Sequence, residues 1–361
     1  MVKNKAMKIL FIISLLQIVA SCKEKGTEPP LTKPFKNPRE MTWTADTLKM
    51  PDYAIQLLPL DLLVVSPEDI WLAAWVGHGQ VYHYDGKTWN MVKEIGGGIN
   101  CLVQGSTPNS IWVGGYIGRD VDGQFTQNAY LGYYNGANWQ DNEFQLKSEL
   151  LDMSTDPSGN IWACGRNGLV FKYENNKWTT DTINLNLNDN VAYWLKSIEN
   201  FNGKTYILAP TAHKTTYLEK YYFLSGDMDN FIVLDSMIFD SPSVTIKWGY
   251  LQLYSSTFNK LYSNGLSGVW IYQDKDWEKI LDVNGTIYNI YGKAENFLLA
   301  VGDYDKVLFY NGSTWMSIAD LFKVNDPTFV FKNVWTDGYE IIITGYGAVN
   351  NKRGTIIWHG K

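Results

Sequence analysis

The chain has 361 residues, of which 45% are hydrophobic and 15% aromatic, and a formal net charge of −6 at pH 7. This hydrophobic fraction supports a large buried core, and an acidic chain without a lysine or arginine block argues against a nucleic-acid partner. The 31 glycines, 15 tryptophans and 23 tyrosines favour many short strands and tight turns over long helices.

Residues 1–21 have the pattern of an export signal. Three lysines precede an apolar run, residues 9–20, that is too short to span a bilayer comfortably. The run leads into VASC, residues 19–22, which resembles the lipobox of bacterial lipoproteins. The resemblance implies cleavage before Cys22, lipidation of Cys22 and membrane attachment through its acyl chains. Lys23 implies the outer membrane, on its periplasmic or cell-surface side; the alternative is an ordinary signal peptide with a chance cysteine.

Residues 22–40 follow as the lipidated cysteine and a tether. The segment 23–40 holds four prolines and eight charged residues and offers almost nothing to bury. This composition predicts a disordered, partly extended linker. We therefore expect the folded body to occupy residues 41–361.

The body contains a repeated unit, clearest in residues 156–180, which reads as three strands separated by turns, the last strand carrying a tryptophan. Repeats of about 40–50 residues with four strands are typical of propeller blades. Seven second strands are expected, at 68–75, 109–116, 159–165, 203–209, 259–265, 296–302 and 339–345. The sequence thus predicts an all-β fold, a seven-bladed β-propeller of four-stranded antiparallel blades.

The chain ends without a fourth strand for the last of these units. Trp43 lies one repeat length before Trp89, but no blade precedes it. An open ring would leave a sheet edge exposed. The segment 41–48 is therefore expected to complete the last blade beside residues 353–361.

The letters DPSGNIWACGRNGLVFKY, residues 156–173, resemble the two-component-regulator type of propeller repeat, with its D-x-x-G-N-[IL]-W core. Residues 154–162 also resemble, more loosely, an Asp-box. The resemblance implies the propeller architecture for nearly all of 41–361. It implies almost nothing about function, because propellers host binders, enzymes and scaffolds alike.

The loops between second and third strands are expected to open on one face of the ring. They carry unlike polar residues, and variation on a constant scaffold predicts a ligand-binding face, although simply solvated loops are the alternative. Three arginines among them could grip an anionic group. The candidate residues are His78, Arg119, Asp120, Asp122, Arg166, His213, Asp303 and Arg353.

No metal site or other cofactor is predicted, apart from a weak calcium possibility at Asp120 and Asp122. That loop lacks the bidentate glutamate of an EF-hand. Cys101 and Cys164 lie in apolar strands and are interpreted as buried small hydrophobes, with a disulfide as the alternative. No catalytic residue stands out.

The sequence therefore predicts a lipid-anchored extracytoplasmic propeller that acts as a binding or scaffold module. Its body is expected to be monomeric, and its ligand is an extracellular glycan or a protein. The alternative is a carbohydrate-active enzyme, which would need a positioned acid/base pair with shifted pKa values.

Overall fold

The computed structural model describes residues 34–361, except 106, 108, 122–123, 188–189, 214–218, 229, 240–245, 325 and 350–351. Phe35–Lys361 form one compact unit. The predicted signal segment, Cys22 and most of the predicted tether lie outside the described residues. Within the described part, no helix is long and apolar enough to cross a membrane.

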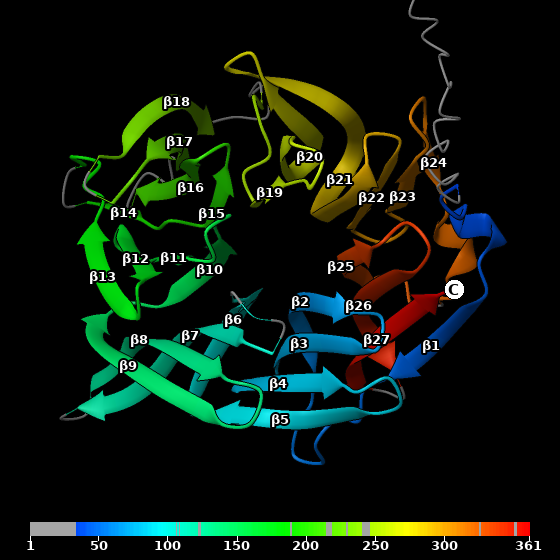
Figure 1. Ribbon diagram of the computed structural model, residues 1–361, viewed down its shortest axis with the longest axis horizontal. Helices are drawn as coiled ribbons and strands as arrows, with labels where there is room; N and C mark the ends of the chain where they lie inside the picture. The colour runs from blue at the N-terminus through cyan, green and yellow to red at the C-terminus, as the bar shows by residue number, and fades with distance from the viewer. Residues whose placement is uncertain are drawn as a thin grey trace, which may run out of the picture. The chain divides into compact units, whose positions relative to one another are not determined.

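Antiparallel strands make up almost all of this unit (Figure 1). The first three sheets follow one another along the chain and contain four strands each. They are β2 (Leu58–Ser66), β3 (Asp69–Trp75), β4 (Gly79–Tyr84) and β5 (Trp89–Ile95); β6 (Gly97–Gln104), β7 (Ile111–Val121), β8 (Gln124–Tyr134) and β9 (Trp139–Lys147); and β10 (Leu150–Thr155), β11 (Ile161–Gly165), β12 (Leu169–Glu174) and β13 (Lys177–Thr182).

The remaining described strands form three further sheets. The five-stranded sheet holds β14 (Val191–Tyr193), β15 (Ser197–Phe201), β16 (Lys204–His213), β17 (Glu219–Gly226) and β18 (Ile232–Phe239). The six-stranded sheet holds β19 (Gln252–Ser255), β20 (Leu261–Gln273), β21 (Asp276–Ala294), β22 (Phe297–Gly302), β23 (Val307–Tyr310) and β24 (Trp315–Ser317). The last sheet joins β1 (Trp43–Thr47) to β25 (Val330–Thr336), β26 (Ile341–Val349) and β27 (Lys352–Gly360), and two short 3-10 helices are η1 (Pro38–Glu40) and η2 (Ala319–Leu321).

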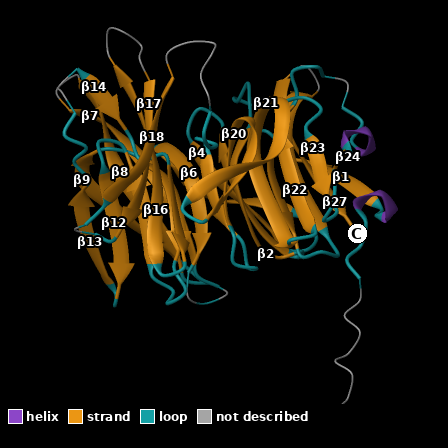
Figure 2. Ribbon diagram, turned by 90° about the horizontal axis from the view of Figure 1, so that it is seen from above, coloured by secondary structure: helices purple, strands orange, loops and turns teal. Residues whose placement is uncertain are grey.

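The innermost strands surround a common centre. In turn, β2 contacts β6, β6 contacts β10, β10 contacts β15, β15 contacts β19, β19 contacts β21, β21 contacts β25, and β25 returns to β2. Figure 1 shows this ring of sheets, and Figure 2 shows the strands running between two layers of loops. The all-β propeller is therefore confirmed. We call the end of the sheets where each innermost strand begins the upper face.

The predicted count of seven four-stranded blades is wrong, because the described residues form six sheets. Strand β21 runs unbroken for 19 residues; its first part pairs with β20 and its second part with β22. The fifth and sixth expected units are consequently one six-stranded sheet. In the sheet before it, β14 adds a fifth strand beside the upper end of β16.

The N-terminal strand closes the ring as predicted. Strand β1 pairs antiparallel with β27, with Trp43 opposite Gly360. The Trp43 ring packs edge-on against Phe322, at 4.8 Å between centroids, and its Nε1 donates to the carbonyl of Pro38. Ordered contacts begin earlier, since Phe35 packs against Phe297 and Arg39 forms an ion pair with Asp320.

The repeated tryptophans are packing residues. Each pairs across a hairpin with a tyrosine at or next to the end of the preceding strand, with ring centroids 4.8 to 5.3 Å apart. All five tryptophans are half-buried at the outer strands. Such cross-strand aromatic pairs stabilise antiparallel sheets. The pairs are Tyr84–Trp89, Tyr134–Trp139, Tyr173–Trp178, Tyr272–Trp277 and Tyr310–Trp315.

Candidate functional site

The central cavity is lined largely by residues at a β-bulge that recurs in the innermost strands. In five of them the pairing register shifts by one residue at the same place, so that one residue has no partner on the next strand. A bulge of this kind leaves the extra residue outside the ladder and re-aims its side chain. The extra residues are Leu60, Asn100, Leu151, Tyr288 and Lys332.

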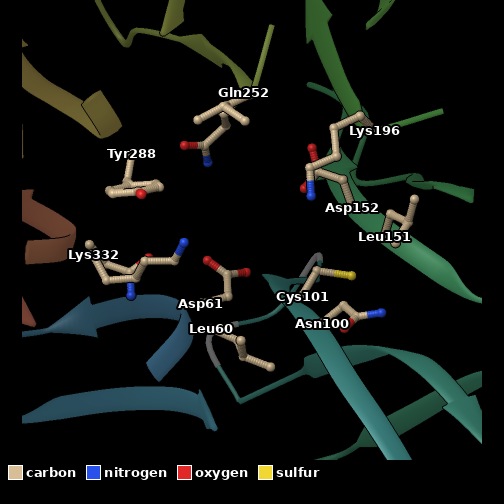
Figure 3. Close-up of a pocket in the computed structure, with 12 residues that line it drawn as sticks. Leu60, Asp61, Asn100, Cys101, Leu151, Asp152, Lys196, Gln252, Tyr288 and Lys332 are labelled. Carbon is tan, nitrogen blue, oxygen red and sulfur yellow. The ribbon is translucent and has the colours of Figure 1, made fainter. Parts of the chain in front are cut away.

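These five side chains line one cavity of about 170 Å³, together with Lys196 and Leu251. Lys196 and Leu251 directly precede β15 and β19, so they stand at the corresponding place of their strands. The six-stranded sheet contributes twice, through Leu251 and through Tyr288 in the second part of β21. Figure 3 labels all of these residues except Leu251 and shows them on different strands around the cavity. One structural position thus presents leucine, asparagine, lysine and tyrosine around a shared centre.

At four of these seven positions, the following residue links neighbouring sheets. Its side chain accepts a backbone N–H from the innermost strand of the next sheet: Asp61 from Leu102 at 2.7 Å, Asp152 from Ile198 at 2.9 Å, Ser197 from Leu253 at 3.0 Å, and Asn289 from Val334 at 3.1 Å. Buried N–H groups need such acceptors, because an unpaired one is costly. We call these side chains the polar belt.

Two members of the polar belt serve a second N–H group as well. Asp61 and Asp152 each accept the N–H of the following residue, Leu62 at 2.8 Å and Met153 at 2.9 Å. In the sheet before Asp152 the belt position holds Cys101, whose thiol is a weak acceptor. A carboxylate with two oxygens satisfies both its own strand and the next one, which explains aspartate at this place.

Burial shifts the pKa values of the carboxylates in this region upwards. It raises the pKa of Asp61, and it raises that of Asp152 to about 7, against the opposing effect of the Ser197 hydroxyl and the Ile198 N–H. Burial also raises the pKa of Glu199 to about 8. The carboxylate of Glu199 accepts from the hydroxyls of Ser154 and Ser255, and so ties β10, β15 and β19 together.

The two lysines of the cavity are its distinctive groups. The Nζ atom of Lys332 lies 4.2 Å from the centroid of the Tyr288 ring, a cation–π contact. Burial, together with the charge of Lys196, lowers the pKa of Lys332 to about 8, while Asp303 opposes the change. Among the described residues, neither lysine Nζ has a hydrogen-bond or ion-pair partner. Two cations without an ion-pair partner in the described part of the chain therefore line a small cavity that Asp61 and Asp152 also line.

The three predicted arginines lie at the upper face and have separate partners. Arg119 pairs with Glu143, and Arg166 pairs with Glu149. Arg353 reaches Thr328 at 3.5 Å and lies over the Tyr346 ring at 5.6 Å to its centroid. The backbones of Arg166 and Arg353 also form isolated bridges to Trp194 and Gln56 at the start of the next sheet. Each arginine thus has a local structural role, and the anion-gripping role stays a prediction.

The other predicted site residues are dispersed. His78 joins a network with Tyr53 and Gln80, whose amide also donates to Glu94 at 2.9 Å. Asp120 lies opposite Phe125 in the β7–β8 ladder, and His213 ends β16 opposite Val191. Asp122 lies outside the described residues, and the described part contains no cluster of three or more metal-binding side chains.

Asp303 is a predicted site residue that acts on two residues lining the cavity, Tyr288 and Lys332. Its Oδ2 accepts the N–H of Thr286 at 2.9 Å, and its proximity, after burial, helps raise the pKa of Tyr288 to about 12. The sequence did not single out Lys196, Tyr288 or Lys332. The sequence signal that could have identified them is a lysine or tyrosine followed by a small polar residue in or next to an otherwise apolar inner strand.

The two described cysteines, Cys101 and Cys164, are buried free thiols. Burial raises both pKa values well above that of an ordinary thiol, which makes thiolate chemistry unfavourable. Both side chains belong to the packed core, in agreement with the interpretation as small hydrophobes.

No family model and no curated protein matches the chain. Solved propellers do: YCF48 bound to D1 peptide has a TM-score of 0.57 at 12% identity, covering 92% of this chain and 99% of that one. YCF48 from Cyanidioschyzon merolae has a TM-score of 0.54 at 12% identity, covering 88% and 98%. The extracellular domain of the hybrid two-component system BT4673 from B. thetaiotaomicron has a TM-score of 0.56 at 15% identity, covering 88% of this chain and 40% of that one. At these identities the similarity establishes the β-propeller fold.

Proposed function

We propose that this protein is a binding module whose central cavity, on the upper-face side of the ring, receives a segment of a partner protein. The observation that supports this proposal most directly is that unlike side chains occupy the bulge position of the innermost strands around one cavity. The neighbouring polar belt position is occupied by side chains that join the sheets. A scaffold whose variation is concentrated around a concavity is the usual arrangement of a binding site.

The chemistry of the cavity favours a protein segment over a glycan. Three leucines and a tyrosine offer apolar surface, beside two lysines and two aspartates that offer charges of both signs. Sugars are commonly held by exposed aromatic faces, whereas the repeated tryptophans here pack within hairpins. A solved propeller of similar fold, YCF48, is bound to a peptide. A glycan ligand is the alternative outcome of the test below.

We further propose that the module acts outside the cytoplasm, attached to the outer membrane through lipidated Cys22. The lipobox resemblance of residues 19–22 supports this. The compact unit starts at Phe35, which leaves residues 23–34 as the connection to an anchor. Two solved propellers of similar fold are described as extracellular domains.

A carbohydrate-active enzyme is the weaker interpretation. Asp61 and Asp152 line the cavity and have raised pKa values, as an acid catalyst would. Their oxygens, however, accept backbone N–H groups of two strands each. These hydrogen bonds give the two carboxylates a structural role in joining the strands.

The test is a binding screen of the protein without residues 1–22 against arrayed peptides and arrayed glycans. A partner segment should emerge from the peptides, with saturable binding to the folded body. Selective binding to glycans would replace the protein segment by a sugar as the ligand. An absence of saturable binding on both arrays would count against a binding module.

A further inference from the structure

We infer that the central cavity binds a single carboxylate group between the ammonium groups of Lys196 and Lys332. The aliphatic part next to that carboxylate would contact Leu60, Leu151 and Leu251. The inference rests on the proposed function, in that the cavity is the binding site. It adds the chemical class that the site selects, the carboxylate of a side chain or chain terminus with an aliphatic neighbour.

The charge arrangement is the first reason. Lys196 and Lys332 line the same cavity and lack ion-pair partners in the part of the chain that the structure describes. The charge of Lys196 disfavours the charged form of Lys332 and so lowers the pKa of Lys332. An anion between them would relieve this repulsion and supply the missing hydrogen-bond acceptors.

The acidic groups nearby restrict which anion fits. Asp61, Asp152 and Asp303 face the same region, but each accepts backbone N–H groups from fixed positions. Within the described residues, none of the three forms an ion pair with Lys196 or Lys332. They would nevertheless repel a second negative charge on a ligand. A monoanion such as a carboxylate consequently fits this cavity better than a phosphate dianion.

The size and lining of the cavity also favour a carboxylate end group with an aliphatic neighbour. Its volume of about 170 Å³ is smaller than the roughly 300–1,000 Å³ of sites that enclose a whole drug-sized ligand. The cavity therefore takes one end group, while the rest of the ligand stays outside. Leucines from β2, β10 and the segment before β19 favour an aliphatic group beside the charge.

The test uses 4-methylpentanoate as the probe, with 4-methylpentanamide as its uncharged match and inorganic phosphate as the dianion. Titration of the protein without residues 1–22 by NMR at pH 7 should show the acid binding at least about tenfold more tightly than the amide or phosphate. Lys196→Met and Lys332→Met should each weaken acid binding, and the double variant should abolish it. Lys87→Met, which removes an exposed lysine in the β4–β5 hairpin, should leave it unchanged.

A pH series separates this role from mere packing. The affinity for the acid should fall between pH 7 and pH 10 as Lys332 loses its proton. The titratable groups around Lys332 are Asp61, Asp152, Lys196, Tyr288 and Asp303. Lys332→Arg should retain binding at pH 10, because a guanidinium stays charged. A bound anion raises the pKa of Lys332, so saturating probe should shift the fall to higher pH.

Several results would overturn the inference. Equal binding of acid and amide, tighter binding of phosphate, no binding of the acid, or full binding by a folded double lysine variant would each do so. The proposed function fails separately. If the arrays yield a peptide that binds the double lysine variant with unchanged affinity, the binding module stands and the carboxylate inference falls.

Discussion

The carboxylate of Asp61 on β2 accepts the backbone N–H of Leu102 on β6 at 2.7 Å, joining the innermost strands of two adjacent sheets. Its other oxygen accepts the N–H of Leu62 in its own strand. The same relation links Asp152 on β10 to Ile198 on β15, two sheets further on. Hydrogen bonds between sheets therefore supplement apolar packing in holding the ring together.

Asp61→Leu should destabilise the protein because it leaves two backbone N–H groups without their acceptor. Each such loss costs about 1–3 kcal/mol, partly offset because the variant no longer buries a carboxylate. We expect a net loss on the order of 2 kcal/mol, measured by urea unfolding, and a smaller loss for Asp61→Asn. Asp52→Leu, at an exposed aspartate, is the matched control. Equal stability of Asp61→Leu and the control would refute the role assigned to Asp61.

Asp152 and Glu199 should make stability fall as pH rises from about 4 to 8. Their folded-state pKa values are about 7 and about 8, whereas unfolded carboxyl groups titrate near 4. Between these limits the folded state binds more protons than the unfolded state, so rising pH favours unfolding. Urea unfolding at pH 5, 7 and 9 should show a flatter dependence for Asp152→Asn/Glu199→Gln than for the wild type. An unchanged slope would contradict the pKa shifts.

Lys332 has the opposite sign and a separate window. Its folded-state pKa is about 8, below the unfolded value of about 10.4, so the unfolded state binds more protons between these values and stability rises with pH there. Below pH 8 its charged form is a full cost to folding. Lys332→Met should therefore raise the melting temperature at pH 7, and the gain should shrink towards pH 10. A melting temperature below that of the wild type at pH 7 would show that the ammonium stabilises the fold.

Removing residues 41–48 should prevent formation of a stable ring, because β1 supplies the outer strand beside β27 and the half-buried ring of Trp43. Removing residues 23–33, within the predicted tether, should leave the melting temperature unchanged. Circular dichroism melting curves of the two deletions compare these effects directly. Equal melting temperatures for both would disprove the closing role of β1.

Cys22→Ala should yield a protein that carries no fatty acid. The lipobox resemblance places the acyl chains on Cys22, and no acyl chain can be attached to alanine there. Metabolic labelling with a fatty acid, followed by isolation of the protein, measures this. Cys101→Ser, at a buried cysteine, should keep the label and serves as the control. Label on the Cys22→Ala protein would exclude the lipoprotein assignment.

Local repeats made much of the fold predictable. A hairpin such as Asp85–Thr88 needs only neighbouring residues: the Asp85 side chain accepts the N–H groups of Lys87 and Thr88, and Gly86 supplies a φ of 85°. The Tyr84–Trp89 pair follows from the same local pattern. The number of sheets, by contrast, could not be predicted from local sequence patterns. Asn284 and Gly285 have the composition of a turn, yet the chain passes through them within β21 and merges two expected units.

For the candidate site, the sequence indicated a region of the ring but not the residues that line the central cavity. The sequence indicated the upper face through variable loops, and Asp303 lies close to the cavity. Lys332 was missed because a bulge depends on the register between two paired strands, which the sequence of one strand does not show. Lys196 was missed because it lies just before its strand, β15. The free ammonium groups became visible only when the ring brought distant strands to one centre.

The most direct test of the central claim is titration of a ligand from the array screen into a variant with an obstructed cavity. Leu251→Trp places a bulky uncharged side chain at the cavity wall, and Ser158→Trp places the same side chain in an exposed loop at the opposite end of a sheet. With both variants folded, by melting temperature, Leu251→Trp should lose at least about tenfold in affinity and Ser158→Trp should bind like the wild type. Unchanged affinity in Leu251→Trp, or a selective loss in Ser158→Trp, would contradict binding at the central cavity.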